Sequence, residues 1–141
     1  MEIKYKLQSI AETEFKMNYE FDYSGLNNDK LQIQVGHEIN PVMDSDKIVI
    51  KAKVTILYED GWAILATNTI LMTFGLSPIN DVITIKGDGT FMSKNHLIID
   101  TFLGAAIGAL RGIFMKNLKG SPLENCYIPL IPLESVRPKR K

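Results

Sequence analysis

The sequence is poor in the residues that carry most catalytic and metal chemistry. Its 141 residues include one cysteine, Cys126, and two histidines, His37 and His96. A single cysteine cannot form an intrachain disulfide, which is typical of a reducing compartment. Neither histidine has companions at metal-ligand spacing. The sequence therefore predicts no metal and no cofactor.

The chain also lacks net charge and a long hydrophobic run. Its 16 Lys and Arg balance 16 Asp and Glu, which argues against a general nucleic-acid binder. The first residues, MEIKYKLQSI, contain no apolar stretch of signal-peptide length. Asp100 and Arg111 bracket the apolar run 101–110, and a spanning helix needs about 20 apolar residues. We expect a cytoplasmic protein with no membrane insertion.

The first part of the chain has the period of β-strands. Apolar side chains fall on odd positions over 15–23, with polar residues between them, which is typical of a strand buried on one face. Tyr5 and Leu7 also alternate, but Ile10 falls out of phase with the series that follows. A slip of one residue turns side chains to the other face, so we expect a bulge or a crossover near 9–13.

Three further strands are predicted. Residues 31–39 and 48–58 alternate cleanly, and an Asp-Gly turn at 59–61 leads into 62–76. The last segment is apolar on both faces, so it must be covered on both, by its own helix or by another subunit. Its even face is predicted to carry Trp62, Ile64, Ile70, Met72 and Phe74.

A long helix is predicted from about Ser93 to Leu118, with Ser93 as N-cap and Gly120 just past the end. The fold class is therefore α+β: a four-stranded antiparallel sheet with one long C-terminal helix packed on it. We expect one domain over residues 1–136. The basic RPKRK end, 137–141, is expected to be disordered and solvated.

The helix has one bulky face and one smooth face. Gly104, Gly108, Gly112 and Ala105 lie away from the bulky face, where a surface helix normally carries polar residues. Each mid-helix glycine costs about 1 kcal/mol relative to alanine, so close packing is expected to offset the cost. A loop of the same chain is one explanation. We favour an oligomer interface, with a helix of a second subunit across these glycines.

No catalytic motif is assembled. Ser93, His96 and Asp100 are close in sequence, but their positions are better explained as a cap, a first-turn residue and an exposed acid than as a triad. KGDGTF, 86–91, lacks the Lys-Ser/Thr ending of a phosphate loop and is predicted to be a turn. We therefore expect that the protein is not an enzyme.

The order of these elements resembles the SecB-type export chaperones and their SecB-like relatives. YKLQSIAETEFKM (5–17) resembles the first strand of that family with its phase break, and LQIQV (31–35) resembles the second. IVIKAKVTI (48–56) and EDGWAILATNTILMTFGL (59–76) resemble the long third and fourth strands. GSPLENCYIPLIPL (120–133) resembles the proline-containing exit from the closing helix. The resemblance covers most of the chain, as a pattern of spacing.

The resemblance implies a homo-oligomer, either a dimer or a dimer of dimers, with helices sandwiched between sheets. It implies that unfolded polypeptides are held in apolar grooves without ATP. By position it implies client-binding roles for two residues of the first strand and three of the second, although each is equally explained as an ordinary core residue. These residues are Tyr5, Leu7, Leu31, Ile33 and Val35.

Two features differ from the export members of the family. Those members continue into a second helix and an acidic tail that reaches the translocase motor, whereas this sequence ends in a basic RPKRK. Lys47, Lys51 and Lys53 lie where export members tend to present acids. Docking to the motor is therefore not expected.

The leading hypothesis is an ATP-independent holdase for unfolded, export-bound or antitoxin-type clients. The alternatives are an oligomeric interaction domain with one dedicated protein partner, or a carrier of a small molecule or lipid between sheet and helix.

Overall fold

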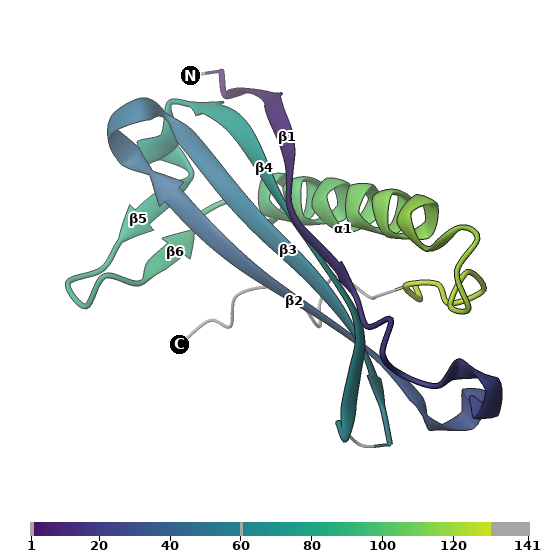
Figure 1. The fold of residues 1–141 in the computed structure, drawn as a ribbon. Helices are drawn as coiled ribbons and strands as arrows, with labels where there is room; N and C mark the ends of the chain where they lie inside the picture. Colours follow the sequence, from purple (N-terminus) through teal and green to yellow (C-terminus); the bar gives the residue numbers. More distant parts are fainter. Residues whose placement is uncertain (1, 60, 131–141) are drawn as a thin grey trace.

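Four long antiparallel strands and one helix make up most of the fold in the computed structural model, which describes residues 2–59 and 61–130. The strand order is β1-β4-β3-β2, so β2, β3 and β4 are consecutive neighbours and β1 lies beside β4, as in a Greek key (Figure 1). This confirms the predicted α+β fold class. The elements are β1 (Lys4–Met17), β2 (Leu31–Val42), β3 (Lys47–Tyr58), β4 (Ala63–Ser77), β5 (Ile83–Ile85), β6 (Phe91–Ser93) and α1 (His96–Leu118).

The core lies between one face of the sheet and α1. Even-numbered residues of β3 are buried and odd-numbered ones face away, as the alternation predicts. α1 packs mainly on β3 and β4, the two central strands. Its buried side chains recur at helical spacing. They include four that are fully buried, Ile99, Leu103, Ala106 and Leu110.

Two bulges in β1 explain the phase break in its sequence. The pairing with β4 shifts between Leu7 and Ser9 and again between Glu12 and Glu14. The first shift moves the helix-facing positions from odd to even residues, and the second moves them back. Tyr5, Leu7, Ile10 and Phe15 therefore all face the side of the sheet that carries α1. The predicted bulge near 9–13 is confirmed.

A third bulge corrects the prediction for β4. The pairing with β3 shifts between Ile56 and Leu57, where Leu65 is the extra residue of β4. Leu65 is fully buried, whereas Ile64 is 57% exposed. Ile64 pairs with Leu57 on the side away from α1, and so it does not share a face with Ile70 as predicted. Trp62 lies in the preceding turn and is also exposed.

The ends of two other elements also differ from the prediction. The alternation over 15–23 predicts a strand as far as Tyr23, but β1 ends at Met17. The chain turns there, because the Asn18 side chain accepts hydrogen bonds from the backbone N–H groups of Glu20 and Phe21. The N-cap of α1 is Asn95 rather than Ser93, because its side chain accepts from the N–H groups of Leu97 and Ile98.

Gly120 follows the C-cap of α1, as predicted, with a φ of +82° that favours glycine. The chain then turns and runs back along the helix. Arg111 fixes this segment, because its guanidinium donates to the carbonyl oxygens of Ile128 (2.9 Å) and Pro129 (2.8 Å). The expected basic tail, 137–141, and the end of the predicted domain at 136 lie outside the described residues.

α1 is long and apolar enough to cross a membrane by length and composition, with 23 residues and a mean hydropathy of 1.7. It is therefore longer than the bracketed run 101–110 from which the sequence argument started. In this fold it packs on the sheet, and 44% of its most apolar window is buried. Core helices of soluble proteins pass the same test, so the helix is weak evidence for a membrane span.

A polar cluster ties β1, β4 and α1 together at the C-terminal end of the helix. Asn68 of β4 is fully buried and donates to a carboxylate oxygen of Glu12 (2.8 Å) and to the carbonyl of Glu14 (2.8 Å). Asn117 of α1 donates to the same Glu12 oxygen (2.6 Å) and to Asn68 Oδ1 (3.0 Å). Glu12 faces the helix only because of the first bulge, so the cluster specifies the register of β1.

We expect Asn68→Ala to lower the free energy of unfolding by about 1–3 kcal/mol, because the fully buried Asn68 amide loses its hydrogen bonds to Glu12, Glu14 and Asn117. Urea denaturation measures the change. Asn40→Ala, on an exposed position of β2, is the matched control and should change stability by no more than about 0.5 kcal/mol. Equal effects of the two substitutions would show that the cluster adds nothing to stability.

Candidate functional site

Three half-exposed apolar side chains on the helix-facing side of β1 form the candidate site. Tyr5, Leu7 and Ile10 are 50%, 49% and 47% exposed, and we call them the β1 strip. They face the same side as the core, but α1 packs on β3 and β4 and leaves the edge strand only partly covered. The strip is therefore an extension of the core beyond the flank of the helix.

The core holds one end of the strip in place. The ring of Tyr5 meets Phe102 of α1 edge-on, with centroids 5.6 Å apart. Phe102 is 1% exposed and stacks on Phe74 of β4, with centroids 4.2 Å apart and planes 10° apart. Offset and edge-to-face aromatic contacts of this kind restrict the rings. The Tyr5 end of the strip is therefore held in place by the core.

The backbone beside the strip is open to pairing. β1 is 14 residues long and, among the described residues, pairs only with β4. Its other edge presents N–H and C=O groups that can pair with an added strand. An apolar strip next to a free strand edge is the arrangement by which a sheet binds an extended peptide.

The five predicted client-binding residues do not lie together. Leu31, Ile33 and Val35 lie on β2, at the opposite edge of the sheet from Tyr5 and Leu7. All five face the α1 side, but the three β2 side chains are only partly exposed and pack against the core. The structure therefore offers two separate apolar edges, of which β1 is the more exposed.

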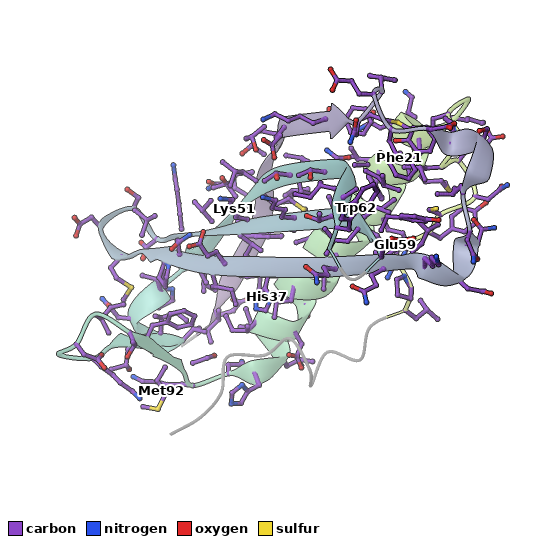
Figure 2. The ribbon with its side chains drawn as sticks, turned by 60° about the horizontal axis from the view of Figure 1, so that its bottom comes forward. Phe21, His37, Lys51, Glu59, Trp62 and Met92 are labelled. Carbon is purple, nitrogen blue, oxygen red and sulfur yellow. The ribbon has the colours of Figure 1, made fainter. Side chains whose placement is uncertain are left out.

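An aromatic cluster at one end of the sheet is missing from the predicted site. Phe21 contacts Tyr23, Tyr58 and Trp62, with centroids 5.0, 5.2 and 6.5 Å apart. Figure 2 shows Phe21 and Trp62 near each other, with Glu59 beside them, and Trp62 is 73% exposed. Phe21 and Tyr23 were predicted on a strand, and only the turn after Met17 brings them to the β3–β4 hairpin.

The predicted interface residues of α1 are all exposed. Gly104, Ala105, Gly108 and Gly112 face away from the sheet, and an added Cβ at each glycine would meet no atom within 4 Å. No loop of the described chain therefore crosses them, which removes the intrachain explanation for residues 2–59 and 61–130. The exposed side of α1 is a smooth apolar face that ends in Leu97 and Met115.

The polar groups that suggest chemistry are dispersed. Ser93 ends β6, and its hydroxyl donates to the carbonyl of Asn95 (3.1 Å). Burial lowers the pKa of His37 below its ordinary value, and burial raises the pKa of the Cys126 thiol, which disfavours the reactive thiolate. Within residues 2–59 and 61–130, no three His, Cys, Asp or Glu side chains are placed to hold a metal ion.

Comparison with known proteins gives no relative. No protein-family model matches the chain, no curated protein matches it, and no solved structure matches its fold. Its function is therefore argued from its own residues.

Proposed function

We propose that the protein is a cytoplasmic, SecB-like holdase that binds extended apolar segments of unfolded polypeptides along β1, without ATP. The observation that carries the proposal is the β1 strip beside a free strand edge. Client side chains would lie against Tyr5, Leu7 and Ile10, and the client backbone would pair with the outer edge of β1. The resemblance of the sequence to the SecB-like family supports the same function.

The energetics of this surface favour loose selectivity. Burial of apolar area contributes about 25 cal/mol per Å², less the cost of ordering the client. Backbone pairing adds affinity but depends little on the client sequence. Two bulges interrupt the strand, so a client would pair in short stretches on either side of them. Such a surface holds many sequences, each with modest affinity.

We propose that the protein acts as a homo-oligomer joined through the smooth face of α1. Gly104, Gly108 and Gly112 let the backbone of another helix approach closely. The packing of Phe102, Leu103 and Leu110 fills the space between α1 and the sheet, and so favours the client function over a carrier of lipids or small molecules.

The test is suppression of aggregation. A denatured substrate protein is diluted into buffer without nucleotide, and light scattering is followed with and without this protein. We expect a several-fold molar excess to suppress scattering. In the variant Leu7→Ser/Ile10→Ser, suppression should need several-fold more protein, because the apolar contact area is lost.

The matched control is Ile85→Ser/Met92→Ser on the β5–β6 hairpin, where the two side chains are 44% and 45% exposed. This hairpin is a separate two-stranded sheet that is not hydrogen-bonded to β1. The control should suppress aggregation as well as the unchanged protein. Equal loss in both variants, or no suppression by the unchanged protein, would rule out the β1 strip as a client site. A pull-down that yields one stoichiometric partner would instead favour a dedicated interaction domain.

A further inference from the structure

The side of the sheet away from α1 is basic, although the whole chain is neutral. We call this side the outer face, defined by the strand residues that alternate with the helix-facing ones. Its charged residues are six lysines and two glutamates. They are Lys4, Lys6, Lys16, Lys47, Lys51, Lys53, Glu14 and Glu38.

The central row of this charge lies on β3. Lys51 and Lys53 are about 7 Å apart along the strand, and Lys47 lies about 13 Å from Lys51. Lys51 and Lys53 are exposed, and Lys47 is partly exposed. An extended polypeptide repeats its side chains on one face at the same period of about 7 Å, so acidic residues at alternate positions match this row.

Two open hollows flank Lys53. One, of about 410 Å³, is lined by Glu14, Lys16, Lys53 and Ile64 and lies at the bulge of Leu65. The other, of about 190 Å³, is lined by Gly36, Glu38 and Lys51, and Gly36 pairs with Lys53 across the strands. The outer face therefore offers lysines beside hollows that can take a small aliphatic side chain, whereas Glu14 and Glu38 disfavour an acidic side chain inside them.

The sign of the charge decides which chains can occupy this face. A second copy that docked through the same face would place lysines against lysines, which is unfavourable. The chain's own RPKRK end carries the same sign. The charge of this face is therefore complementary to an acidic segment of a different polypeptide.

The composition of the face favours a polypeptide over a nucleic acid. Its strand residues include no arginine and no aromatic side chain, which supply base stacking in single-strand binders. Glu38 lies directly opposite Lys51, and Glu14 pairs with Lys16 at 3.3 Å. Those carboxylates repel a uniform chain of phosphates, whereas a peptide can place neutral residues and backbone N–H groups beside them.

We propose that the outer face docks an extended acidic segment of another polypeptide along β3, with Asp or Glu at alternate positions beside Lys47, Lys51 and Lys53. This site lies on the opposite side of the sheet from the β1 strip. It does not depend on the holdase function, because a client and an acidic partner would bind different faces.

Fluorescence anisotropy tests the proposal with a labelled peptide of about 12 residues in which Glu alternates with Val or Ser. We expect saturable binding that weakens as salt is added. Lys47→Glu/Lys53→Glu should weaken it by about tenfold or more, because two attractions become repulsions. These lysines are suitable because Gly75, Val42, Gly36 and Thr69, their cross-strand partners, are uncharged.

The matched control is Lys86→Glu/Lys94→Glu, which makes the same change in net charge near the β5–β6 hairpin and should leave the affinity unchanged. A second peptide with Lys in place of Glu should not bind. Equal weakening by both double variants, or equal binding of the two peptides, would overturn the proposal. Tighter binding of single-stranded poly(U) RNA than of the acidic peptide at the same ionic strength would also overturn it.

Discussion

Phe102→Ala is expected to lower the free energy of unfolding by about 3–5 kcal/mol, the range for removing a buried aromatic side chain. Phe102 is 1% exposed and connects three elements, because it stacks on Phe74 of β4 and meets Tyr5 of β1. Its loss leaves a cavity between α1 and the sheet that the surrounding strands can fill only partly. Urea denaturation followed by circular dichroism measures the change.

Thr101→Ala is the control for this prediction, because Thr101 is the neighbouring residue of the same helix and is exposed. Its hydroxyl donates only to the carbonyl of Leu97, one turn earlier (2.8 Å). We expect a change within about 0.5 kcal/mol. Should the two variants unfold at the same urea concentration, α1 does not pack on the sheet through Phe102.

The sheet was largely predictable from the sequence because its strands have one buried face. The alternation in β3 is regular, and the burial of every even residue from Ile48 to Tyr58 follows it. The phase break around Ile10 predicted a bulge in β1 for the same reason: helix-facing side chains must stay on one side while the backbone gains a residue. Periodicity therefore locates bulges where the other face is polar.

The same reasoning failed in β4, where both faces are apolar. Ile64, Leu65 and Ala66 give no change of pattern when one residue is inserted, so the bulge at Leu65 leaves no trace in the sequence. The N-cap failed for a similar reason. Ser93 and Asn95 are both good caps, and the β5–β6 pairing, which claims Ser93 for a strand, decides between them.

The candidate site was only partly predictable. Periodicity places Tyr5, Leu7, Leu31 and Val35 on apolar strand faces, but it does not say how far α1 covers each strand. Exposure of the β1 strip depends on the position of β1 at the edge and of α1 over the two central strands. The aromatic contacts of Phe21 with Tyr58 and Trp62 join residues far apart in the sequence, which no local pattern indicates.

Gly108→Leu is expected to break the proposed oligomer, with the mass in light scattering falling toward the 15.9 kDa of one chain. Gly108 lies at the middle of the smooth face, and a leucine there has open space in a single chain. It would hold a second helix several Å away from the close contact that glycine permits. Leucine is also the better helix former by up to about 1 kcal/mol, so the single chain should remain folded or become more stable.

This gain in helix propensity makes the result interpretable, because a loss of mass would not come from unfolding. Gly87→Leu is the matched control: Gly87 lies in the β5–β6 turn, and its added side chain also meets no atom within 4 Å. It should leave the mass unchanged. A Gly108→Leu protein with the mass of the unchanged oligomer, or an unchanged protein that is already a single chain, would refute the interface on α1.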